Sequence, residues 1–129
     1  MAMLTIRKAQ MQALGRAAMQ EFEKDMLQHL RQFFPDECAA LGSKALREHT
    51  RHAIARAKEY GLTSERDLCK YLNLTMIYGR DFDTDPELEW MRDFLIDPDV
   101  SDPSERMRRL YAESLHRLEP EAVDLGSSV

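Results

Sequence analysis

The sequence predicts an all-α protein, a single-domain helical bundle of about five main helices with a long N-terminal helix. No segment alternates apolar and polar residues for long enough to form a strand, whereas apolar residues recur at helical spacing through most of the chain. Three Asp-Pro pairs are typical of helix starts, because the carboxylate caps free amides and proline fits the first turn. Residues 1–118 form the predicted bundle domain, and residues 119–129 form a flexible C-terminal tail.

The first predicted helix fills the interval before Pro35 and ends at residues 33–34. Its apolar positions form one broad stripe: Met11, Leu14, Ala18, Phe22, Met26, Leu30 and Phe33. A helix of almost thirty residues carries more apolar surface than a small bundle needs, so part of it is expected to dock a partner. The eight methionines fit either core filling or an adaptable binding surface.

Two helices follow, each ended by a glycine. Ser43 begins the first and Gly61 ends it. The second begins near Ser64, which forms a capping box with Asp67, and ends at Gly79 with Ile77 facing the core.

Acidic residues then mark the last two helices. Asp85 starts a short helix that Asp97 and Pro98 interrupt. Asp102 caps the final helix, with Glu105 as its capping-box partner. The predicted buried side of that helix comprises Met107, Leu110, Tyr111, Leu115 and Leu118.

Charge is divided unevenly along the chain. Residues 1–60 carry ten basic and seven acidic groups, a net +3, and residues 61–129 carry eight basic and sixteen acidic groups, a net −8. Such an acidic protein is repelled by phosphates, so nucleic acid is excluded as a partner. No apolar run suits a membrane span, and no secretory signal precedes the first helix. Cys38 and Cys69 are expected to be buried free thiols, which favours a location in the reducing cytoplasm.

No set of residues has the spacing that catalysis or metal binding requires. Asp81, Asp83 and Asp85 resemble the start of a calcium loop, but its glycine and glutamate positions hold Pro86 and Arg92. The pairs His49 with His52 and Glu113 with His116 lack further metal ligands. Serines occupy helix-cap positions, and no phosphate-binding glycine loop occurs. We therefore expect no enzyme, no cofactor and no metal.

Two charged surfaces are the candidate partner-binding sites. Arg47, Arg51 and Lys58 fall on one arc of a helix, in line with Lys44. Asp81, Asp83 and Asp85 form the second surface and are expected to be solvated capping carboxylates.

The stretch from Tyr60 to Trp90, YGLTSERDLCKYLNLTMIYGRDFDTDPELEW, resembles a group of small bacterial proteins. Their shared pattern is a glycine-ended helix, a TSERD-like helix start, a GRDFDTDP-like loop and an aromatic residue. The similarity extends to MQEFEKDMLQHLRQFFPDECAALG and PSERMRRLYAE. It implies an all-helical accessory protein encoded near type VI secretion effectors and spike proteins, and it transfers no active-site residue.

The leading hypothesis is a cytoplasmic protein-interaction module, a chaperone or adaptor for a secreted toxin or spike component. An immunity protein is the first alternative, because an acidic patch suits the basic groove of a toxin. The others are a small metal-dependent enzyme using His49, His52 and acidic residues, and a structural homodimer held by the long helix and by the opposite charges of two copies.

Overall fold

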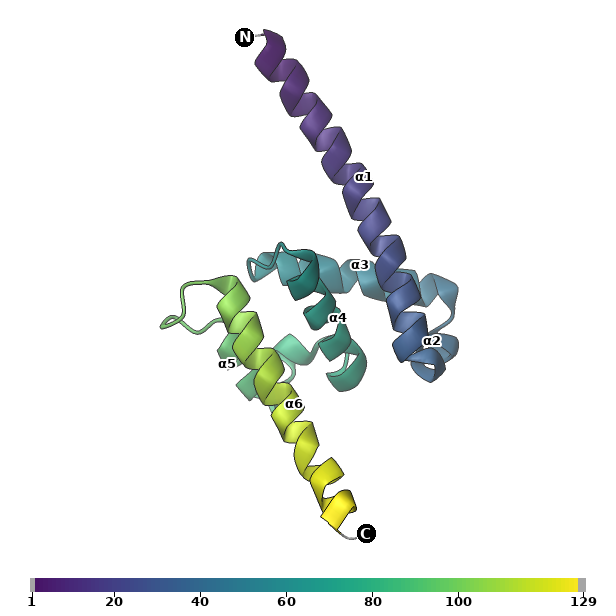
Figure 1. The fold of residues 1–129 in the computed structure, drawn as a ribbon, viewed down its shortest axis with the longest axis vertical. Helices are drawn as coiled ribbons and strands as arrows, with labels where there is room; N and C mark the ends of the chain where they lie inside the picture. The colour runs from purple at the N-terminus through teal and green to yellow at the C-terminus, as the bar shows by residue number, and fades with distance from the viewer. Residues whose placement is uncertain (1, 128–129) are drawn as a thin grey trace. The chain divides into compact units, whose positions relative to one another are not determined.

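In the computed structural model the chain begins with one long helix, α1 (Ala2–Phe33), drawn from purple to blue in Figure 1. The structure describes the backbone of residues 2–127 and the side chains of residues 15–118. At about 1.5 Å per residue, the 32 residues of α1 span about 48 Å. The predicted contributions of Met11 and Leu14 lie outside the described side chains.

The remaining elements follow through short connections. They are α2 (Pro35–Leu41), α3 (Ser43–Glu59), α4 (Glu65–Tyr78), the 3₁₀ turns η1 (Phe82–Thr84) and η2 (Pro86–Leu88), α5 (Glu89–Leu95) and α6 (Pro103–Ser127). The described residues contain six α-helices and no strand, which confirms the predicted all-α class.

The chain divides into two compact units, residues 1–51 and residues 52–129. In the first unit, α2 folds back on the end of α1 (Figure 1). Its buried apolar side chains include Phe22, Leu30, Cys38 and Leu46, contributed by α1, α2 and α3. The domain boundaries that the sequence predicts, including the tail at residues 119–129, stay a prediction, since those side chains lie outside the described part.

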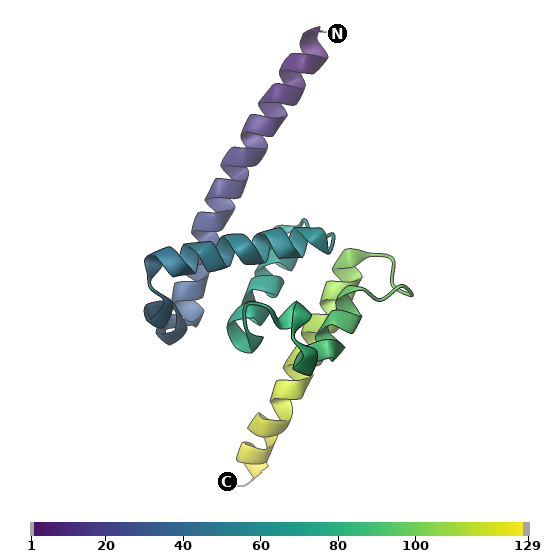
Figure 2. The same cartoon turned by 180° about the vertical axis from the view of Figure 1, so that it is seen from behind.

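In the second unit, α6 packs against both α4 and α5, and Figures 1 and 2 show α5 and α6 side by side. The core of this unit includes Tyr71, Leu72, Phe82, Met91, Met107 and Leu110. Trp90 lies at its edge, half-buried, with the guanidinium of Arg117 3.8 Å from the centre of its ring.

Several helix starts are capped as the sequence predicts. Ser64 accepts a hydrogen bond from the Asp67 amide at 3.1 Å, and Asp102 accepts one from the Ser104 amide at 3.1 Å. Asp85 caps η2 by accepting from the Glu87 amide at 2.9 Å, so a 3₁₀ turn precedes α5. The predicted capping role of Glu105 is wrong, because its carboxylate pairs with Arg108 and Arg109 instead.

Four large side chains that the sequence places on apolar faces are substantially exposed, as is the smaller Ala18. Phe33 is 61% exposed, Ile77 39%, Leu115 44% and Leu118 40%. Phe33 and Ile77 lie at the ends of α1 and α4, and helical spacing alone shows which face is apolar without showing how much of it is covered. Among the described residues, none of the helices has both the length and the apolar character needed to cross a bilayer.

The turn after α3 lies close to the start of α6, and Gly61 is the residue at this close approach. Its φ is +85°, and a β-carbon added there would lie 2.9 Å from Cγ of Pro103. We expect Gly61→Ala to lower the free energy of unfolding by about 2 kcal/mol or more, through the positive φ and the overlap with the proline ring. Urea denaturation of the variant measures this loss.

The matched control is the double variant Gly61→Ala/Pro103→Ala. Removing the ring atoms relieves the overlap but leaves the backbone strain, so the double variant should be less destabilised than the sum of the two single changes. Simple additivity would show that Pro103 does not limit the space at this turn.

Candidate protein-interaction site

The three predicted basic residues all lie exposed on α3. Arg47 and Arg51 belong to the first unit, where the Nε of Arg51 lies 2.9 Å from Glu23 of α1. Lys58 belongs to the second unit. An exposed ion pair of this kind contributes at most about 1 kcal/mol, so Arg51 stays available to a competing partner carboxylate.

The three predicted acidic residues have different environments. Asp81 is exposed and lies 3.2 Å from the Nε2 of His52, and Asp85 is the half-buried cap of η2. Asp83 has 1% of its side chain exposed. The prediction of solvated carboxylates is therefore wrong for Asp83, which cannot offer its charge to a partner at the surface.

Asp83 is held by residues of α3 and the turn that follows it. Its Oδ2 accepts hydrogen bonds from the Nε of Arg56 at 3.0 Å and from the Tyr60 hydroxyl at 2.8 Å, and the second guanidinium nitrogen of Arg56 contacts the same oxygen. Tyr71 of α4 packs between the rings of Tyr60 and Phe82. Arg56, Tyr60, Tyr71 and Asp83 together are called the Asp83 cluster below.

The cluster shifts the ionisation of its members. Burial, followed by the hydrogen bond to Asp83, raises the pKa of Tyr60 to about 12. Burial, followed by the charge of Asp83, raises the pKa of Tyr71 as well. The hydrogen bond to Asp83 raises the pKa of Arg56, so the guanidinium stays charged. At neutral pH the Arg56 guanidinium is therefore charged, and the phenols of Tyr60 and Tyr71 are neutral.

Two polar atoms of the cluster are buried without a hydrogen-bond partner, the Tyr71 hydroxyl oxygen and Asp83 Oδ1. Arg56 lies near enough to the Tyr71 hydroxyl to lower its pKa, but the geometry is not that of a hydrogen bond. An unmade hydrogen bond costs about 1–3 kcal/mol per buried group. The cluster therefore holds the segment of residues 81–85 against α3, and the two unmade hydrogen bonds lower the stability of the fold.

Sequence reasoning missed Arg56 and Tyr60. The available signal was a base and a tyrosine four residues apart on one helix, a spacing that places both on the same side. Neither residue belongs to a site that the sequence predicts.

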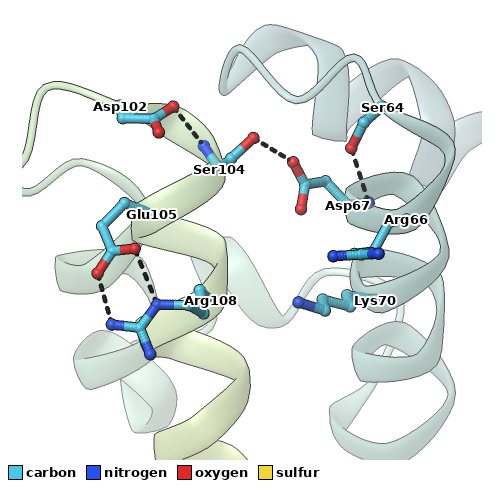
Figure 3. A pocket seen from close by; sticks show the side chains of 8 residues that line it. All are labelled: Ser64, Arg66, Asp67, Lys70, Asp102, Ser104, Glu105 and Arg108. Carbon is cyan, nitrogen blue, oxygen red and sulfur yellow. Dashed lines mark hydrogen bonds and ion pairs between the residues drawn. The ribbon is translucent and has the colours of Figure 1, made fainter.

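A pocket of about 460 Å³ lies between the starts of α4 and α6 (Figure 3). Arg66 and Lys70 of α4 lie opposite Arg108 of α6. The Ser104 hydroxyl of α6 donates a hydrogen bond of 2.5 Å across to Asp67 of α4, which is 4% exposed (Figure 3).

This pocket is electrically balanced. Three basic side chains face three acidic ones, Asp67, Asp102 and Glu105. Hydrogen bonds from Arg108 and Arg109 lower the pKa of Glu105 to about 2, so its carboxylate stays ionised. The basic and acidic side chains of the pocket balance, and its carboxylates are already bonded to neighbouring donors. The pocket therefore connects α4 and α6 and is not suited to selecting a small ion.

The histidines considered as metal ligands do not belong to a group of three or more potential ligands in the described part of the chain. His49 is buried, and His52 pairs with Asp81. No group of three or more potential ligands gathers anywhere in the described part of the chain.

Breaking the buried ion pair of the Asp83 cluster should be costly. We expect Asp83→Ala to destabilise the protein by about 1.5–3 kcal/mol, because the part-buried Arg56 and the Tyr60 hydroxyl then lose their charged acceptor. Asp81→Ala, which removes an exposed carboxylate on the same loop, should change stability by less than about 1 kcal/mol. Thermal or urea unfolding of the two variants checks this; equal losses would contradict a buried role for Asp83.

Tyr60 should make stability fall at alkaline pH. Its pKa is about 12 in the folded protein against an ordinary value of 10.0. Above pH 10 the unfolded chain loses this proton while the folded chain retains it, so the free energy of unfolding declines from pH 10 to 12. Tyr60→Phe should reduce that slope relative to the unchanged protein. Urea unfolding at several pH values measures it, and an unchanged slope would contradict the assignment.

No protein-family model, no curated protein and no solved structure matches this chain. The resemblance carried by residues 60–90 therefore stays a prediction. What the structure establishes is an all-α chain of two compact units, in which one predicted docking carboxylate is internal and five predicted docking residues remain at least partly accessible.

Proposed function

We propose that this chain is a protein-interaction module, a chaperone or adaptor that binds a secreted toxin or a spike component in the bacterial cytoplasm. The type VI secretion context of the proposal comes from the resemblance of residues 60–90, and the choice of a protein as the partner comes from the exposed apolar surface of α1.

The observation that carries the proposal is the poor cover of α1. Between residues 15 and 33, the buried apolar side chains are Phe22 and Leu30, whereas Met19, Met26 and Leu27 are half-buried. Phe33, at the end of the helix, is 61% exposed. An aromatic ring left in water gives up a large part of the stabilisation that its burial would supply, so a partner that covers it gains binding energy.

The surrounding charges suit a polypeptide partner. Arg47 and Arg51 stand exposed on α3 in the same unit as Phe33. Protein interfaces commonly combine an apolar centre with a charged rim, and rim charges direct the encounter.

Photo-crosslinking in the native host tests the proposal. A photoreactive amino acid replaces Phe33 in one strain and Lys24, an exposed polar position of the same helix, in the control strain. We expect a defined crosslinked polypeptide from position 33 and little from position 24, with mass spectrometry naming a toxin or spike component. A protein that stays uncrosslinked at position 33 beside its genomic neighbours would contradict the proposal.

A substitution then measures the contribution of the ring. Phe33→Ser should weaken binding of the identified partner by about thirtyfold, the loss typical of a central aromatic contact, while the stability of the isolated chain changes little. Lys24→Ser is the matched control and should leave affinity unchanged.

An immunity protein is the second candidate, supported by the carboxylates that remain exposed around the acidic loop. The side chain of Asp81 is 66% exposed, and Glu87, Glu89 and Asp93 are exposed nearby in sequence. Survival of cells that co-express the partner toxin distinguishes an inhibitor from a chaperone, because a chaperone does not block the toxin.

A further inference from the structure

A second pocket, of about 390 Å³, lies within the first unit where α1 ends and α3 begins. Its floor is apolar. Cys38 is 6% exposed and Leu46 is 1% exposed, and Pro35 and Ala39 of α2 complete the walls. Small-molecule sites have this size and a mainly apolar lining with a few polar groups that fix orientation.

Arg31 supplies a positive charge to this pocket. It lines the pocket, and the described part of the chain provides it with no ion pair. Its charge reaches the floor, since it lowers the pKa of the Cys38 thiol against the larger opposite effect of burial. The guanidinium is therefore placed to meet an anion that enters the pocket.

The start of α3 adds hydrogen-bond donors. Gly42, which precedes the helix, has no side chain to cap it, and the first turn of α3 contains no acidic residue. By contrast, α2, α4 and α6 each carry carboxylates in the first turn. Gly42 and Ser43 line the pocket, so the positive end of this 17-residue helix borders it.

The Cys38 thiol is an independent sign of an absent ligand. This side chain is more than nine-tenths buried, lines the pocket and has no hydrogen-bond acceptor among the described residues. Burial raises the pKa of the thiol, which therefore keeps its proton at neutral pH and can donate it to an anion.

We propose that this pocket binds a carboxylate carried on a short apolar group. Arg31 and the first-turn amides of α3 hold the carboxylate, Cys38 donates a weak hydrogen bond, and the apolar floor covers the attached group. Two sources share this chemistry: a free short-chain carboxylic acid, and the C-terminal carboxylate of a polypeptide that ends in a small apolar residue.

Titration of the full chain, followed by amide NMR, tests the proposal. The probes are butyrate, an acetylated tetrapeptide ending in valine, and the same peptide with an amidated C-terminus. We expect saturable shifts of the amides of residues 38 and 43–46 with at least one carboxylate probe and none with the amide. Saturation by butyrate alone identifies a free acid, and saturation by the peptide alone identifies a polypeptide end.

Variants link the effect to the pocket. Arg31→Gln should weaken binding about tenfold or more, the loss expected for a charged hydrogen bond. Arg16→Gln, which changes an exposed arginine of the same unit outside the pocket, should bind like the unchanged protein. Equal weakening by both variants would indicate nonspecific attraction and overturn the proposal, as would shifts that do not saturate.

Alkylation gives a second readout that does not depend on Arg31. A bound ligand should slow the reaction of iodoacetamide with Cys38 and leave Cys69 unaffected, with peptide mapping to separate the two. Protection of neither thiol at a probe concentration that saturates the NMR shifts would place the ligand elsewhere.

Discussion

The ion pair between the part-buried Arg56 and the buried Asp83 is the constraint on which the second unit depends most directly. It joins the end of α3 to the turn that follows α4. It thereby positions the acidic segment, residues 81–89, that leads into α5. A buried ion pair is often no more stabilising than apolar residues of the same volume, but losing one partner is expensive because the other charge is left in a poor solvent. The pair therefore fixes one arrangement of the acidic segment more than it adds to stability, and the unsatisfied Asp83 Oδ1 and Tyr71 hydroxyl are consistent with that interpretation.

Around this pair the structure separates two uses of charge. The capping carboxylates Asp85 and Asp102 act locally, on helix amides two residues away. Asp67 acts across helices, through the hydroxyl of Ser104. Exposed acids such as Glu87, Glu89 and Asp93 contribute to the field that a partner meets. The same carboxylate chemistry thus builds the fold in some places and presents a surface in others.

The sequence predicted the helices well and the side-chain environments less well. Periodicity, capping residues and glycine stops gave the class, the order and most boundaries, because these depend on neighbours in the chain. Phe33 and Leu118 were placed on buried faces because spacing shows which side of a helix is apolar, and it does not show where the neighbouring helix ends. Asp83 was taken as solvated because its partners, Arg56 and Tyr60, lie more than twenty residues away and reach it only through the fold.

The Trp90 ring has a practical consequence. It is the single indole of the chain, stacked under Arg117 of α6 and close to Tyr78 and Phe94. Fluorescence excited at the red edge of protein absorption therefore originates from one place, the seam between α5 and α6. The intensity and emission wavelength of Trp90 fluorescence therefore report whether α5 and α6 stay packed together. Separation of α6 can be followed in this way without an added dye.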